Sequence, residues 1–362
     1  MTAPNPALEQ FLKSIPLFSL VDPPDMMDLL RLLRPVTLDP GQVLFREGTP
    51  GVAMWVLGQG TEVTISTTPK EGKRPVVIAY AKTGETVGEM ALIEDGPRSA
   101  TAVVMQGGLA HEISAVEFQT LRQSFSPAAF KVLRRLCVEL CSKLRATADR
   151  VAPSKQEPVV TPPLEAGRVA TREDIDAFPA LRPLPSTVKL ALTQKMRVVE
   201  TTEFMPIFAE GDAADAAYFL LEGEVMIGRG GKTLATLGAG NMFGIVAAID
   251  SGTRSASVIA NGPTRMLRLT DADFDQLFAT GNRFAFALVD MVARQLVQHV
   301  RSLNAMVQSP GGPRLTPTAV PVVASFAAAA TARPTPVSAD SLDSLAMELE
   351  LDLSPEMPDG MS

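Results

Sequence analysis

The sequence predicts an α+β chain that contains two tandem β-roll (jelly-roll-like) domains with flanking helices. Short runs rich in β-branched and aromatic residues are bounded by glycine, proline and polar turns, which is typical of strands. Segments with apolar residues three and four apart lie on either side of these runs and predict helices. The whole series then occurs a second time, which indicates a duplicated domain.

The first series begins and ends with helices. Apolar spacing predicts helices over 11–18, 25–33 and about 127–150. Strand-like runs lie between them, at 52–65, 75–80, 101–104 and 110–113. Ser114 and Glu117 have the spacing of a capping box, which predicts that a further helix opens there.

Equivalent residues show the duplication directly. Trp55 and Tyr218 are 163 positions apart, whereas Arg98 and Arg254 are 156 apart. The offset changes at a hairpin tip, where the segment 66–75 of the first copy faces a shorter loop in the second. Because insertions are tolerated at such tips, the change supports two copies of one fold.

Length and composition set the expected domain boundaries. The chain has 362 residues, of which 46% are hydrophobic, enough for two cores of ordinary size. Proline-rich stretches indicate a linker and a disordered tail. The expected organisation is a flexible N-terminus (1–10), a first domain (11–150), a linker (151–175), a second domain (176–307) and a disordered tail (308–362).

The segment from Gly88 to Thr101 carries the groups that a small cyclic phosphate ester requires. Glycine lets the backbone approach a ligand closely, and the Glu89 carboxylate can hold neighbouring hydroxyl groups. The Arg98 guanidinium can bind a phosphate through two parallel hydrogen bonds, and the Ser99 hydroxyl can add another. The segment therefore predicts a binding site for a phosphate ester of a sugar.

The pattern Gly-Glu-x-Ala-Leu followed by Pro-Arg-Ser-Ala resembles the phosphate-binding cassette of the cyclic nucleotide-binding domain family. That family includes the regulatory subunits of cAMP-dependent protein kinase and the bacterial catabolite activator proteins. The resemblance implies a cyclic nucleotide ligand, with cAMP as the first candidate and cGMP as the alternative. It also implies that Glu89 accepts a ribose hydroxyl and that the long helix moves to cap the base. The expected ligand residues are Gly88, Glu89, Met90, Ala91, Arg98, Ser99 and Ala100.

The second copy keeps only part of this pattern. Gly244, Arg254 and Ser255 are retained, but Ile245 stands where the first copy has Glu89. An isoleucine cannot accept a hydrogen bond from a sugar hydroxyl. We therefore expect a weak phosphate site or an empty one, and the alternative for Arg254 is an ordinary ion-paired or solvated arginine.

Several functional classes find no support in the sequence. Two histidines and two cysteines that form no CxxC pair give no basis for a metal site, a redox site or a catalytic triad, so we expect neither an enzyme nor a cofactor. A net charge of −7 without a basic recognition helix argues against direct DNA binding. No apolar run is long enough for a membrane span, and no leader pattern is visible, so a cytoplasmic location is expected.

The predicted function is a cyclic nucleotide receptor that signals through ligand-dependent contacts with an unidentified protein. The alternative is an adaptor that keeps the fold without responding to ligand. Apolar residues on the last helix have the spacing of a helix-pairing seam, which predicts a homodimer unless this face packs within the chain. These residues are Val289, Val292, Leu296, His299, Leu303 and Met306. The acidic and leucine-containing segment 342–353 is a candidate docking segment or an ordinary tail.

Overall fold

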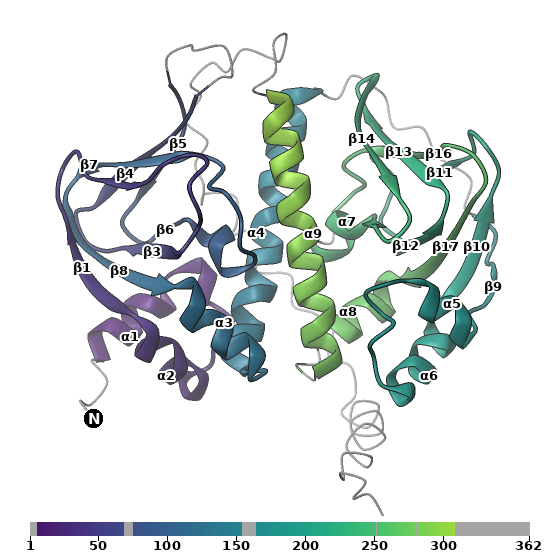
Figure 1. Cartoon of the computed structure of the whole chain (residues 1–362), viewed down its shortest axis with the longest axis horizontal. Helices are drawn as coiled ribbons and strands as arrows, with labels where there is room; N and C mark the ends of the chain where they lie inside the picture. Colours follow the sequence, from purple (N-terminus) through teal and green to yellow (C-terminus); the bar gives the residue numbers. More distant parts are fainter. Residues whose placement is uncertain are drawn as a thin grey trace, which may run out of the picture.

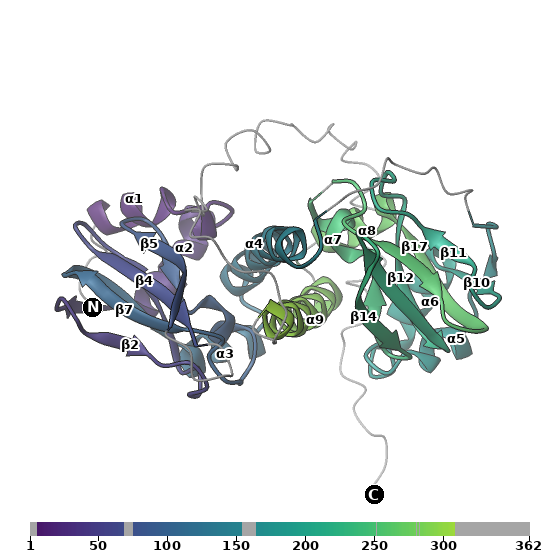
Figure 2. The same ribbon diagram turned by 90° about the horizontal axis from the view of Figure 1, so that it is seen from above.

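The computed structural model describes residues 6–68, 75–153, 164–250, 252–279, 281 and 283–307. Two lobes, each a β-roll with short helices at its base, lie on either side of two long central helices (Figure 1). Seen from above, the long helices lie side by side between the two β-rolls (Figure 2). The predicted α+β architecture with two tandem domains is confirmed.

The first lobe follows the predicted order of elements. Its helices are α1 (Pro6–Lys13), η1 (Pro16–Phe18), α2 (Pro23–Leu32), η2 (Glu89–Leu92), α3 (Ala115–Gln123) and α4 (Pro127–Val151). Its strands are β1 (Arg34–Leu38), β2 (Val43–Phe45), β3 (Ala53–Leu57), β4 (Glu62–Thr67), β5 (Val76–Lys82), β6 (Thr86–Val87), β7 (Thr101–Gln106) and β8 (Gly108–Ser114). They form two antiparallel sheets, ordered β1-β8-β3-β6 and β2-β7-β4-β5.

The second lobe repeats this topology. Its helices are α5 (Arg172–Ala177), α6 (Ser186–Lys195), α7 (Ile245–Asp250), α8 (Asp271–Ala279) and α9 (Arg283–Val307). Its strands are β9 (Arg168–Val169), β10 (Arg197–Thr201), β11 (Pro206–Phe208), β12 (Ala216–Glu222), β13 (Glu224–Arg229), β14 (Lys232–Gly238), β15 (Met242–Phe243), β16 (Ser257–Ala260) and β17 (Thr264–Thr270). The sheets are ordered β15-β12-β17-β10-β9 and β11-β16-β13-β14, so each strand of the first lobe has a counterpart.

The two lobes share one apolar core along the central helices. Helices α4 and α9 each have 25 residues and begin 156 positions apart, which is the offset read from the sequence. Leu136 and Leu140 on α4 and Val292 and Leu296 on α9 are fully buried and belong to one cluster. Because burying such a side chain contributes about 1.5–3 kcal/mol, this face is a major source of cohesion between the lobes.

The seam predicted on the last helix is therefore used within the chain. Val289, Val292 and Leu296 are inaccessible to solvent, and α9 packs along α4. Packing of α9 against α4 of the same chain therefore accounts for this apolar face. A homodimer stays a prediction, but the apolar spacing of the last helix no longer supports it. Cys137 and Cys141 are buried and free, as expected for small core residues, and burial raises the pKa of both thiols.

Three expectations about local structure need correction. The chain is already helical from Pro6, inside the segment expected to be flexible, and β9 and α5 begin inside the expected linker. Ser114 precedes α3 but its side chain makes no capping hydrogen bond, and the Glu117 side chain pairs with Arg34. The expectations for 308–362, including the acidic segment 342–353, lie outside the described residues.

Candidate functional site

Gly88 opens the cassette and is required there for two reasons. Its φ of 86° lies in the left-handed region, which glycine adopts without strain. A Cβ atom at this position would lie 2.6 Å from an Arg98 nitrogen and 3.2 Å from the Ala53 carbonyl oxygen. The glycine thus allows the backbone and the arginine to approach each other closely.

Arg98 is held rigidly as a buried cation. Its two terminal nitrogens donate to the carbonyl oxygens of Gly88, at 3.0 Å, and Ala53, at 2.5 Å. The guanidinium carbon lies 4.1 Å from the ring centroid of Phe45 and 5.6 Å from that of Trp55.

The charge of Arg98 has no ion-pair partner in the part of the chain that the structure describes. The Arg98 Nε is buried without a hydrogen-bond partner, and no carboxylate of the described residues pairs with the guanidinium. Burial lowers the pKa of Arg98, although the neighbouring Glu89 opposes this effect. A fixed cation without an ion-pair partner is suited to binding an anion.

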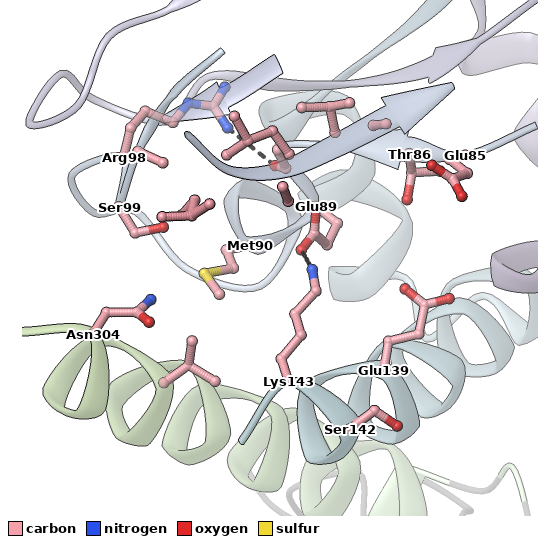
Figure 3. A pocket seen from close by; sticks show the side chains of 18 of the residues that line it. Glu85, Thr86, Glu89, Met90, Arg98, Ser99, Glu139, Ser142, Lys143 and Asn304 are labelled. Carbon is pink, nitrogen blue, oxygen red and sulfur yellow. Dashed lines mark hydrogen bonds and ion pairs between the residues drawn. The ribbon is translucent and has the colours of Figure 1, made fainter. Parts of the chain in front are cut away.

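Glu89 lies in η2 and is 7% exposed. Its carboxylate forms an ion pair with the ammonium of Lys143 on α4 (Figure 3). Burial alone would raise the pKa of Glu89, but the charge and hydrogen bond of Lys143 outweigh burial and lower it. Glu89 is therefore ionised and available as a hydrogen-bond acceptor, with Lys143 as its present partner.

All seven predicted ligand residues of the first copy line one cavity of about 530 Å³. This volume lies within the ordinary range of small-molecule sites. Glu139 and Lys143 on α4 close one side of the cavity, and Asn304 on α9 closes another (Figure 3). The last helix of the second lobe is thus part of the wall of the first site.

The residues on α4 and α9 were not predicted as site residues. Glu139 and Lys143 lie four positions apart on a helix whose opposite face is apolar, so their charges indicate a second functional face. Arg301, which also lines the cavity, is the equivalent of Arg145 at the offset of 156. These two signals could have suggested a role for the helices, but not the contacts that they make.

Two equivalent arginines, one on each long helix, form ion pairs with the opposite lobe. Arg145 on α4 binds both carboxylate oxygens of Asp250, at 2.5 and 2.8 Å, and the Thr253 carbonyl oxygen at 2.8 Å. Arg301 on α9 pairs with Glu94, the residue equivalent to Asp250. Each long helix is therefore ion-paired to the cassette of the other lobe. The Arg145–Asp250 and Arg301–Glu94 pairs are equivalent to each other at the offset of 156.

The second cassette keeps the arginine geometry but supplies its own anion. Arg254 donates to the carbonyl oxygens of Gly244, at 2.9 Å, and Ala216, at 2.7 Å, as Arg98 does in the first copy. It also pairs with Asp215 at 2.5 Å and is 2% exposed. Ser255 follows in the same turn. The alternative of an ion-paired arginine therefore describes Arg254 in this structure.

Ile245 does not face a sugar site. It is 1% exposed, lies at the start of α7 and belongs to the apolar core shared with α4 and α9. The long helices of the two lobes also differ at two positions. Gln295 and His299 on α9 are the equivalents of Glu139 and Lys143 on α4. Gln295 is engaged with the backbone N–H and carbonyl of Met242. The second copy thus keeps the arginine but has uncharged or neutral residues at the positions of Glu89, Glu139 and Lys143.

Burial of His299 predicts a pH-dependent loss of stability. It lowers the pKa of His299 to about 4, compared with about 6.5 for an unfolded chain. Between these values the unfolded state binds more protons, so stability falls as the pH drops through this window. We expect this histidine to lower the free energy of unfolding by about 1–2 kcal/mol between pH 7.5 and pH 5.

Urea denaturation of wild type and His299→Gln at both pH values measures this effect. The variant should lose that part of the pH dependence, and His111→Gln controls for the chain's other histidine, whose pKa burial also lowers. An equal pH dependence in wild type and His299→Gln would contradict the proposed burial of a neutral imidazole.

Comparison with known proteins gives the same class of domain for both lobes. Residues 35–125 and 204–280 match the family model of the cyclic nucleotide-binding domain. Each of the two lobes therefore contains a segment that matches the cyclic nucleotide-binding domain. The predicted resemblance is confirmed by this match.

Two relatives illustrate the range of similar proteins. The cyclic AMP receptor protein of Thermus thermophilus is 37% identical over 117 residues, which cover 31% of this chain and 54% of the relative. The cAMP-dependent protein kinase type II regulatory subunit of Drosophila melanogaster is 24% identical over 302 residues, which cover 82% of this chain and 68% of the relative. The chain thus spans about half the length of the first relative and about two thirds of the second.

A solved structure with similarity to this chain is the regulatory domain of Toxoplasma gondii PKA with cAMP. It is 20% identical, and the match covers 76% of this chain and 92% of that domain with a TM-score of 0.30. Within the described part of this chain, no helix is both long and apolar enough to cross a membrane. The same residues contain no group of three or more metal-ligand side chains.

Proposed function

We propose that the chain is a receptor that binds one cyclic purine nucleotide, with cAMP as the first candidate, in its first domain. It would act by changing its contacts with another protein rather than by catalysis. The observation that carries the proposal is the convergence of seven cassette residues on one cavity around Arg98, a buried cation without a carboxylate partner. A cytoplasmic location and the absence of DNA binding remain predictions from the sequence.

Two features of the second lobe support the adaptor role for that lobe. In the second lobe Asp215 already neutralises Arg254, and Ile245 is committed to the core. That lobe would then serve interaction and geometry, whichever function the first lobe has. The two functions differ in whether the first cavity binds ligand.

The test is a titration with cAMP, cGMP and a pyrimidine cyclic nucleotide. The chain has a single tryptophan, and Trp55 lies beside Arg98, so its fluorescence should report occupancy alongside calorimetry. We expect one equivalent of ligand per chain. Replacing Arg98 by alanine should weaken binding about 10- to 100-fold, because a charge-assisted contact contributes about 1.5–3 kcal/mol.

Arg31→Ala is the matched control, since Arg31 lies on α2 with its side chain 61% exposed and does not line the cavity. Thermal unfolding of Arg98→Ala verifies that the variant is folded before its affinity is interpreted. Undetectable binding of every cyclic nucleotide to the wild type would favour the adaptor. Undiminished affinity in folded Arg98→Ala would place the ligand elsewhere.

A further inference from the structure

The ligand acceptor Glu89 is already occupied by a residue of the helix that closes the cavity. Lys143 on α4 donates to Glu89 across the space between cassette and helix (Figure 3). We propose that the Lys143–Glu89 ion pair is the closed state of a ligand-operated latch. When the ligand binds, a sugar hydroxyl donates to Glu89 in place of Lys143, and the Lys143 ammonium then pairs with Glu139. This inference rests on the proposed function, because the ligand must present a hydroxyl group beside its phosphate.

A ligand hydroxyl and the ammonium of Lys143 are both donors, and an ionised carboxylate only accepts hydrogen bonds. Lys143 donates to Oε1 of Glu89, so the latch requires that the ligand hydroxyl take this same oxygen. Burial alone would lower the pKa of Lys143, but Glu89 outweighs burial and raises it, so the lysine is charged. Displacing Lys143 from that oxygen separates this ion pair, and the free energy of separation lowers the observed affinity for the ligand.

Lys143 is the partner that can move. Glu89 is fixed in η2 with its side chain 9% exposed, whereas the Lys143 side chain is 38% exposed and extends from α4 into the cavity. A lysine has four rotatable side-chain bonds and can swing without moving the helix backbone. The cassette can consequently keep its geometry while the contact to α4 is released.

Glu139 provides the second position for the lysine. It precedes Lys143 by four residues on α4, the spacing and order that favour a glutamate–lysine pair on a helix. It lines the same cavity, and its nearest ion-pair contact is the Arg135 Nε at 3.9 Å. Burial raises the pKa of Glu139 to about 7, and approach of the lysine ammonium would stabilise its ionised form.

The second lobe provides an internal comparison. Glu89, Glu139 and Lys143 correspond to Ile245, Gln295 and His299, so the acceptor, the second position and the cation are replaced together. Three positions with unrelated roles would have no common physical reason to differ together between the lobes. The joint loss is expected if the three residues work as one unit and the second lobe no longer uses it.

The test measures the affinity of cyclic AMP and cyclic GMP for Lys143→Met in the full chain, by calorimetry and Trp55 fluorescence. Methionine keeps the apolar stem and removes the competing cation, so the affinity should increase about fivefold or more. Lys131→Met is the control, because Lys131 lies on the same helix and pairs with Asp22 and Asp25 away from the cavity. Its affinity should equal that of the wild type.

Glu139→Gln supplies a second readout. It should weaken binding severalfold in the wild type, since the displaced lysine loses its new partner, and should have no effect in the Lys143→Met background. An unchanged or weaker affinity in Lys143→Met would overturn the latch while leaving nucleotide binding intact. Absence of binding in both wild type and Lys143→Met would overturn the proposed function, and the latch with it.

Discussion

Replacing Ile245 by glutamate is expected to destabilise the protein by about 3–5 kcal/mol and not to create a second nucleotide site. Because Ile245 is the equivalent of Glu89, sequence comparison alone suggests that a glutamate at this position would restore the hydrogen-bond acceptor and with it nucleotide binding. In the structure, however, Ile245 is 1% exposed and packs into the core shared by the central helices. The positions equivalent to Glu139 and Lys143 hold Gln295, which is already hydrogen-bonded to Met242, and a neutral His299, so neither supplies the cation that Lys143 gives Glu89.

Urea denaturation followed by circular dichroism measures the predicted loss, and calorimetric titration counts the nucleotides bound. Ile245→Met is the matched control, because a volume-conserving change in a core usually costs less than about 1.5 kcal/mol. The double variant Ile245→Glu/His299→Lys should recover part of the loss by supplying a cation. A stable Ile245→Glu protein that binds a second equivalent would show instead that the second lobe is a latent sensor.

The cassette residues could be grouped from the sequence because they are close together in the chain, and whether they bind a nucleotide stays a prediction. Gly88, Glu89, Arg98 and Ser99 lie within twelve positions, and η2 with the loop that follows it brings them to one cavity. The sequence did not predict Lys143 as the partner of Glu89, because 54 positions separate the two residues and only the packing of α4 joins them. Contacts of this kind depend on tertiary structure that a local pattern does not contain.

The fate of Arg254 was left open for the same reason. Its partner Asp215 corresponds at the offset of 163 to Val52, which is 64% exposed in the first lobe. The aspartate belongs to no motif, and its significance appears only when the fold places it beside the guanidinium. The Ser114 capping box shows the opposite error, since the local pattern is present but the Ser114 side chain makes no cap and the Glu117 side chain pairs with the distant Arg34.

The seam on α9 shows a third limit of sequence reasoning. A period of three and four residues identifies an apolar face but does not identify the surface that covers it. The two equal helices offset by 156 residues give the chain an internal partner of the right length. One chain thereby supplies both sides of a paired-helix interface, and the cross-contacts of Arg145 and Arg301 join each helix to the opposite cassette.

Leu296→Glu is therefore expected to destabilise the folded chain, by at least the roughly 2–5 kcal/mol typical of truncating a buried leucine. Leu296 is fully buried between the lobes, and the variant would place an unpaired carboxylate in this apolar contact. The affinity for nucleotide should also fall, because Val300, Arg301 and Asn304 on the same helix line the first cavity. Thermal unfolding and the fluorescence titration measure the two effects.

Leu190→Glu is the control, because Leu190 is 63% exposed on α6 and a charge there should change stability by no more than about 0.5 kcal/mol. The dependence on protein concentration separates the intrachain seam from an intermolecular one. If α9 pairs with α4 of its own chain, the melting temperature of the wild type should not change over a hundredfold range of concentration. A melting temperature that rises with concentration would mean that folding is linked to association, and the apolar seam would then belong to a dimer.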